Sequence, residues 1–171
     1  MRSLDRIEDV YAEHLLVLEG QGYHLEGEHY SLRFVIDEQE IDRLRFKTPQ
    51  FGTYWLGVTF LSIGVSDGYK LRQDDSAQSA LSITSDCVKS QNYNSAGFLF
   101  ICSTQTMHDT GFVGVDCGRE RMFSVKTGTS ERMQFVLSDL KGVPLSVPKD
   151  FDFESCCLGV TLARSRRILG E

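Results

Sequence analysis

The sequence lacks the long apolar run that a membrane-spanning helix requires. No stretch reaches about eighteen apolar residues, and the longest apolar segment, Tyr54–Val65, is interrupted by Gly57, Thr59, Ser62 and Gly64. The first six residues lead into an acidic mixed segment, where a secretory signal would have an apolar core. We therefore expect no membrane span and no secretory signal, and we interpret Tyr54–Val65 as a core strand.

The sequence also lacks the cysteine and glycosylation patterns of secreted proteins. Its five cysteines are an odd number, none forms a Cys-x-x-Cys pair, and no Asn-x-Ser/Thr sequon occurs. The cysteines are Cys87, Cys102, Cys117, Cys156 and Cys157. This pattern points to a reducing compartment in which all five are thiols. Cys156 and Cys157 would point to opposite faces of a strand, so we expect no bridge between them.

Positive charge is scarce. Lys and Arg number 18 against 24 Asp and Glu, which gives a formal net charge of −6. Proteins that hold nucleic acid concentrate Lys and Arg on one surface, so we expect no nucleic-acid partner. Arg164, Arg166 and Arg167 are clustered in the last eight residues. We interpret residues 164–171 as a solvated basic tail that is available to an acidic partner.

Motifs for phosphate and metal binding are missing as well. Gly20-x-Gly22 has the wrong spacing for a dinucleotide fingerprint, and no Lys-Ser/Thr follows it. His24 and His29, with two glutamates between them, could meet a metal on a hairpin, but a third convincing ligand is absent. A half-exposed strand explains these histidines better, and we expect no cofactor and no metal.

Cys102 offers an arrangement that resembles a catalytic group. It lies six residues before His108 and Asp109, which superficially supply a base and an orienting carboxylate. Residues so close within a strand and its loop rarely reach triad geometry, and Cys102 falls at the end of an apolar strand pattern. We interpret it as a buried thiol and expect no catalytic residue.

Residues 131–138 alternate in the period of a β-strand. One face would carry Met133, Phe135 and Leu137, and the other Gln134, Val136 and Ser138. We predict that Phe135 and Leu137 lie in a core while Gln134 does not. A turn is predicted at residues 139–142, since Asp139 can bond the following backbone and Gly142 can take a positive φ.

The rest of the chain repeats this β pattern at intervals. Pro144 and Pro148 favour extended backbone after the turn, and the final strand is predicted over Phe151–Leu162, as the second arm of a terminal hairpin. Further strands are predicted at Tyr30–Ile36, Gly52–Val65, Tyr69–Arg72, Ala80–Ile83, Gly97–Ser103, Phe112–Val115 and Arg121–Val125, with one helical turn in Asp37–Leu44.

These patterns predict an all-β fold, an antiparallel β-sandwich of the single jelly-roll type. At 171 residues the chain fits one domain. We expect an N-terminal extension at residues 1–20, either helical or extended, a sandwich at 21–163 and the basic tail at 164–171. Aromatic residues on such a scaffold can bind partners, and Tyr93 and Trp55, together with the three arginines of the tail, are the predicted contacts.

Residues 133–145, with their Asp-x-x-Gly-x-Pro turn, precede Phe151-Asp-Phe-Glu and a last apolar strand ending at Leu162. This resembles the C-terminal end of small jelly-roll capsid proteins of Polinton-type elements and large eukaryotic DNA viruses, and the likeness extends back over Gly97–Gly118. The resemblance implies a vertex (penton), minor capsid or spike-like subunit of a virion, assembled inside the host cell. Its implied partners are further copies of itself, with a pentamer favoured and a trimer possible, and a major capsid protein.

The same features fit two other classes of protein. One is a trimeric TNF-like or fibre-head module that recognises a protein or glycan through Asn92–Ser95 and Met107–Gly111. The other is an enzyme that uses Cys102 with His108, or a cupin-like metal site built from His24 and His29. We expect the structural, non-enzymatic role.

Overall fold

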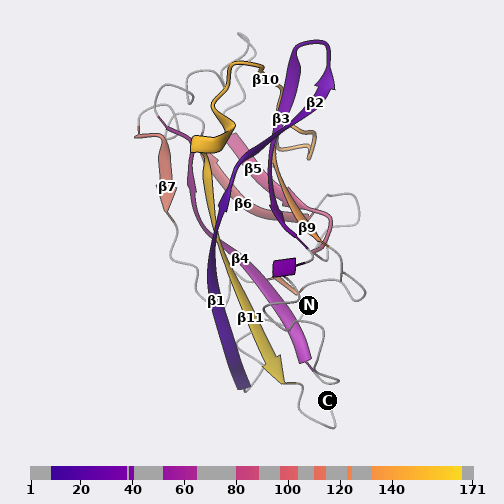
Figure 1. Ribbon diagram of the computed structural model, residues 1–171. Helices are drawn as coiled ribbons and strands as arrows, with labels where there is room; N and C mark the ends of the chain where they lie inside the picture. The colour runs from indigo at the N-terminus through magenta and orange to yellow at the C-terminus, as the bar shows by residue number, and fades with distance from the viewer. Residues whose placement is uncertain are drawn as a thin grey trace.

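The computed structural model describes residues 9–37, 39–40, 52–64, 80–88, 97–103, 110–114, 123–124 and 132–166. The strands in these segments pair antiparallel and form two sheets (Figure 1). The predicted all-β sandwich is therefore confirmed at this level. In the described part of the chain, no helix is long and apolar enough to cross a membrane.

The first sheet, sheet A, has the strand order β1-β11-β4-β7, and β8 also pairs with β4. Its strands are β1 (Asp9–Glu19), β11 (Cys157–Arg166), β4 (Gly52–Ser62), β7 (Phe112–Gly114) and β8 (Phe123–Ser124). The long strands β1, β11 and β4 lie side by side in Figure 1. The strands predicted around residues 52, 112 and 121 are all present here, with shorter bounds.

The second sheet, sheet B, has the order β10-β3-β9-β5-β6, and β2 also pairs with β3. Its strands are β2 (Gln21–Glu26), β3 (His29–Ile36), β5 (Ala80–Ser85), β6 (Gly97–Ser103), β9 (Met133–Ser138) and β10 (Val147–Pro148). The strands predicted near residues 30, 80, 97 and 131 are confirmed. Tyr69–Arg72 lies outside the described residues.

The core lies between the two sheets and is built from alternate residues of the strands. On β9, Met133, Phe135 and Leu137 are buried, whereas Gln134 and Val136 are partly exposed. The predicted faces are therefore confirmed over residues 133–137, whereas Ser138, predicted on the face of Gln134, is buried. Burying one face of each sheet against the other removes the apolar side chains from water, which is the main source of stability in a sandwich.

Residues 9–19 of the predicted N-terminal extension are extended and form an integral strand of sheet A. β1 pairs with β11 along its length, so the boundary expected at residue 20 falls between two paired strands, β1 in sheet A and β2 in sheet B. Gly20 makes this transition possible, because a Cβ there would collide with the Phe153 carbonyl oxygen and lie 2.8 Å from Leu32 Cδ1. Its amide donates to the Cys156 carbonyl oxygen at 2.9 Å.

The turn after β9 forms as predicted. Asp139 Oδ1 accepts hydrogen bonds from the amides of Lys141 at 2.8 Å and Val143 at 3.0 Å, and Gly142 has a φ of +84°. The predicted turn within Asp37–Leu44 has one described contact, in which the Glu40 amide donates to Asp37 Oδ1 at 2.8 Å.

The predicted terminal hairpin is wrong. β9 belongs to sheet B and β11 to sheet A, so the segment between them crosses from one sheet to the other. The strand predicted from Phe151 begins only at Cys157, because Phe153–Ser155 forms a 3-10 turn, η4. The ring of Phe153 occupies the space above Gly22, where a Cβ would lie 2.7 Å from it. This contact holds the crossing segment against β2.

Candidate functional site: an apolar face of sheet A

The side of sheet A that points away from the core carries a connected set of uncharged residues, which we call the outer face. Directly paired residues of neighbouring strands point to the same side of a sheet. The register pairs Leu15 with Thr161, Val17 with Gly159, Gly159 with Phe60, Cys157 with Ser62, and Ser62 with Phe112. The outer face therefore consists of Leu15, Val17, Phe60, Ser62, Phe112, Cys157, Gly159 and Thr161.

Three large apolar side chains of the outer face are strongly exposed. Leu15 and Val17 are each 60% exposed, and Phe112 is 50% exposed. Their neighbours along the same strand behave differently, since Leu16 and Leu18 are partly buried against the core. β1 is therefore apolar on both of its faces, although only one of them meets the core.

Phe60 lies flat over the middle of the outer face because β11 has a glycine there. A Cβ at Gly159 would collide with the Phe60 ring. On its other side, Phe60 stacks on Phe112 of β7, with 5.8 Å between the ring centroids and 26° between the planes. A hydrogen bond of 2.9 Å between the hydroxyls of Thr59 and Thr161 ties β4 to β11 nearby. The face is thus flat and internally connected.

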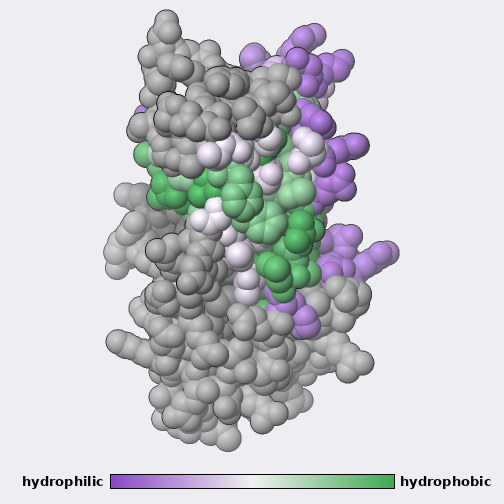
Figure 2. Space-filling view, turned by 90° about the vertical axis from the view of Figure 1, so that its left-hand side faces the viewer, coloured by the Kyte–Doolittle hydropathy of each residue, from purple (hydrophilic) through white to green (hydrophobic). Residues whose placement is uncertain are grey.

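At one end of the outer face, the described residues include a charged side chain. Glu19 follows Val17 on the same side of β1, pairs with Cys157, and is exposed. The side of the molecule that faces left in Figure 1 shows a band of hydrophobic residues across its middle, with hydrophilic residues along one border (Figure 2). A connected apolar surface of this kind, rimmed by polar residues, marks an interaction site in many proteins.

The contact residues predicted from the sequence are not among the exposed residues of the outer face in the described part of the chain. Trp55 is only 2% exposed, so the role predicted for it as a surface aromatic is wrong for this conformation. Tyr93 and Arg167 lie outside the described residues. Arg164 and Arg166 are part of β11, where they pair with Ala12 and Asp9 of β1. The predicted basic tail therefore begins within a strand.

Cys102 lies at a buried position on β6, as expected, with 7% of its surface exposed. Burial raises the pKa of its thiol from the ordinary value of 9.0 to about 11. The thiolate, which is the nucleophilic form, is therefore scarce at neutral pH. His108 and Asp109 lie outside the described residues.

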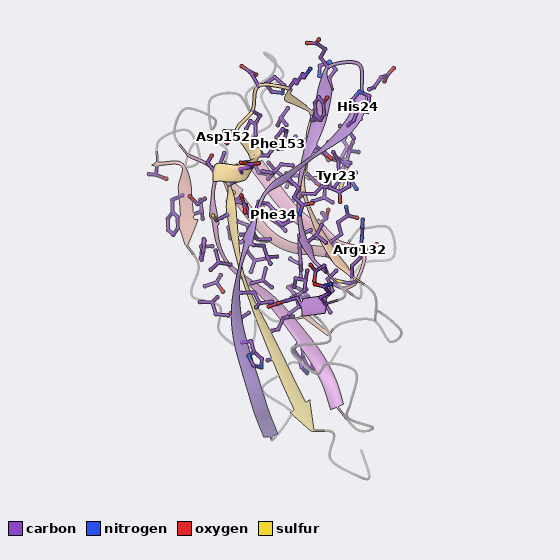
Figure 3. The ribbon with its side chains drawn as sticks, viewed as in Figure 1. Tyr23, His24, Phe34, Arg132, Asp152 and Phe153 are labelled. Carbon is purple, nitrogen blue, oxygen red and sulfur yellow. The ribbon has the colours of Figure 1, made fainter. Side chains whose placement is uncertain are left out.

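His24 and His29 lie at the end of the β2–β3 hairpin, and each has a local explanation. His24, which is labelled in Figure 3, donates from Nε2 to the Gly27 carbonyl oxygen at 2.7 Å. Its ring packs edge-on against Tyr30, with 5.3 Å between the ring centroids. His29 is exposed. Within the segments that the structure describes, no group of three His, Cys, Asp or Glu residues could hold a metal.

Another stretch of the sequence has the spacing of a hydrolase motif. Residues 64–68 read Gly-Val-Ser-Asp-Gly, the Gly-x-Ser-x-Gly pattern of hydrolases. That motif works on a sharp turn between a parallel strand and a helix, whereas Gly64 follows β4 of an antiparallel sheet. Residues 65–68 themselves lie outside the described residues, so the motif carries no assignment.

Sequence reasoning missed the outer face. The sequence predicts only an extension at residues 1–20, either helical or extended, and a strand at Phe112–Val115, and neither prediction indicates an exposed apolar face. The run His14-Leu-Leu-Val-Leu18 did hold a signal, because five consecutive positions with little polarity suit a strand that is apolar on both faces. Comparison of the chain with protein-family models, curated proteins and solved structures finds no match.

Proposed function

We propose that the chain is a single jelly roll that works as a structural subunit. When β2, β8 and β10 are set aside, eight of the described strands remain. Taken in sequence order, the first of these pairs with the last, the second with the seventh, the third with the sixth, and the fourth with the fifth. The four pairs are β1 with β11, β3 with β9, β4 with β7, and β5 with β6, all antiparallel. A long antiparallel ribbon wound into two sheets gives this order, which supports a jelly roll.

The outer face of sheet A is the observation that carries the proposal. Leu15, Val17 and Phe112 would each be removed from water by a flat partner, and apolar burial is the main driving force of most association. The other residues of this face are small or uncharged, so no buried charge would oppose the contact. A face of this kind suits repeated contacts between copies of one subunit.

The assembly we propose is a closed ring of this chain within a virion. The resemblance of residues 133–162 to small jelly-roll capsid proteins supports a vertex (penton) or minor capsid subunit, assembled inside the host cell beside a major capsid protein. Vertices combine identical subunits through repeated heterologous contacts, and such contacts close into cyclic oligomers. A pentamer is therefore favoured, and a trimer is the alternative ring.

The experiment compares two pairs of substitutions by native mass. Leu15→Lys with Val17→Lys places two charges on the outer face. Leu140→Lys with Val143→Lys, the matched control, makes the same change at residues that are 51% and 56% exposed in the turn after β9. Sedimentation and light scattering should show an oligomer for the parent and the control, and a smaller species for the outer-face variant.

Two results would contradict the proposal. A parent chain that stays monomeric at high concentration, alone and with capsid partners, would remove self-association. An outer-face variant that keeps the parent's native mass, with an unchanged melting temperature, would show that the contacts lie on another surface.

A further inference from the structure

Among the residues that the structure describes, β1 is an edge strand with no paired strand on the side away from β11. In the described sheet it pairs with β11 alone, at one end of the order β1-β11-β4-β7. Half of the main-chain donors and acceptors of an edge strand point away from its one neighbour. These groups can form a second ladder of hydrogen bonds.

The edge lacks most of the features that usually protect such strands. β1 is 11 residues long and contains neither Pro nor Lys, whereas natural edges are short, bulged or charged. Its one register shift lies between Val10 and Ala12, so Ala12–Glu19 pairs without interruption. The opposite end of the sheet is different, because β7 has only 3 residues.

The side chains of β1 determine which added strand would pair with it favourably. Leu15 and Val17 are 60% exposed on the outer face, and Glu19 follows on the same side. β1 contains three acidic residues, Asp9, Glu13 and Glu19, and no Lys or Arg. Opposite charges on directly paired positions stabilise neighbouring strands, as do paired apolar side chains.

We infer that β1 accepts an extended segment of another polypeptide as an added strand of sheet A. The segment that fits carries apolar residues opposite Leu15 and Val17 and a Lys or Arg opposite Glu19. Main-chain hydrogen bonds along the open edge supply the attachment, and the alternate side chains supply the selectivity. The site goes beyond the proposed function, because it needs no self-association of the chain.

A second copy of β1 fits this edge poorly. Two β1 strands related by a twofold axis pair antiparallel, and the register that places Leu15 opposite Val17 also places position 13 opposite position 19. That register sets glutamates against each other twice, and every other twofold register still brings together two strands that each carry three acidic residues and no Lys or Arg, which is unfavourable. A basic segment avoids this repulsion, and charge complementarity therefore selects it as the occupant.

The probe is a fluorescein-labelled peptide, Thr-Lys-Thr-Val-Thr-Val-Thr, titrated with the full chain and followed by anisotropy. Two further peptides carry N-methyl groups, one on the Lys and Val residues and the other on the intervening Thr residues. Only one edge of an extended peptide faces β1, so one methylated peptide should lose binding and the other should keep it. Equal behaviour of the two methylated peptides, or no binding of the parent peptide at millimolar concentration, overturns the inference.

The contact between Glu19 and the peptide Lys is tested by exchanging the two charges. Glu19→Lys should weaken binding of the parent peptide by about two- to fivefold, the effect of one cross-strand pair. A peptide with Glu in place of Lys should recover that loss on the Glu19→Lys chain. If the Glu peptide does not recover the loss on the Glu19→Lys chain, the peptide does not lie beside Glu19 and the inference fails.

A third variant separates this site from the proposed function. Phe112→Lys changes the outer face at β7, away from the β1 edge, so it should reduce self-association and leave peptide binding unchanged. A chain that never assembles can still bind the peptide. Assembly without peptide binding would overturn only the strand addition.

Discussion

Phe34 on β3 and Phe135 on β9 occupy directly paired positions, and both side chains are 0% exposed in the core. Val35 and Gln134, the next pair along, point to the other side of sheet B and are partly exposed. One cross-strand pair therefore fixes the register of two strands that lie about a hundred residues apart in the sequence.

Phe135→Ala should lower the free energy of unfolding by about 3–5 kcal/mol, since the site is fully enclosed and the surrounding rings can refill it only in part. Val136→Ala, on the same strand and the opposite face, should cost about 1 kcal/mol or less. Urea denaturation measures both. Equal losses for the two variants would mean that the faces of β9 are assigned wrongly.

Asp139 should stabilise the turn after β9 through its two backbone contacts. Asp139→Ala removes the acceptor for the Lys141 and Val143 amides, and the expected cost is about 1–2 kcal/mol, as for other side-chain caps. Asp139→Asn keeps the same oxygen and should lose less than half of this. If Asp139→Asn lowers the melting temperature as much as Asp139→Ala does, the negative charge, and not the hydrogen bonds, matters at this position.

Local features of the fold could be predicted from the sequence because they depend on neighbouring residues. The alternation over residues 133–137 and the Asp and Gly of the following turn each act within a few positions. The pairing of strands, in contrast, depends on residues that are far apart in the sequence. That β11 lies between β1 and β4, and that β9 lies in the other sheet, follows from burying the apolar faces of distant strands together. A short pattern such as Phe151–Leu162 does not contain that information.

The outer face could not be found for a related reason. Leu16 and Leu18 point to the core while Leu15 and Val17 point to solvent, yet the sequence presents all four as similar apolar residues. Trp55 shows the opposite error, because an aromatic residue expected at the surface is buried. Exposure depends on which other strands cover a face, and it becomes visible only in the assembled sheets.

Cys102 should make the chain less stable at alkaline pH. Its folded pKa of about 11 lies above the ordinary 9.0, so the folded state favours the neutral thiol, and the stabilisation is complete below about pH 9. As pH rises from there toward 11, the unfolded chain ionises first and the stabilisation is lost. Cys102→Ala should therefore show a smaller fall in the urea midpoint between pH 8 and 10.5 than the parent. An identical fall in both proteins would place the thiol in contact with water.

Burial should also determine how fast the individual thiols react. Cys87, Cys102, Cys156 and Cys157 are thiols in the structure, and Cys117 lies outside the described residues. After denaturation, all five should react with a thiol reagent. In the native chain Cys157, which is partly exposed on the outer face, should react faster than Cys102. A protected pair after denaturation, Cys102 with Cys117 above all, would point to a disulfide and a secreted role.

Two truncations distinguish the paired end of β11 from the residues that follow it. Ser165 and Arg166 pair with Val10 and Asp9 on one side and with Thr53 and Gly52 on the other. Deleting 165–171 removes these ladder contacts and should cost about 1–2 kcal/mol, at roughly 1 kcal/mol for each net hydrogen bond lost. Deleting 167–171 leaves the pairs in place, so the melting temperature of this longer chain should match that of the parent.

Native mass is measured on both truncated proteins. Neither contains the arginine at position 167, and only the longer chain keeps the arginine at position 166. If the longer chain keeps its stability but assembles less well, the terminal residues contact a neighbouring subunit directly. If the longer chain is as unstable as the shorter one, residues 167–171 stabilise the fold themselves. The strand pairs at positions 165 and 166 then do not explain the lost stability.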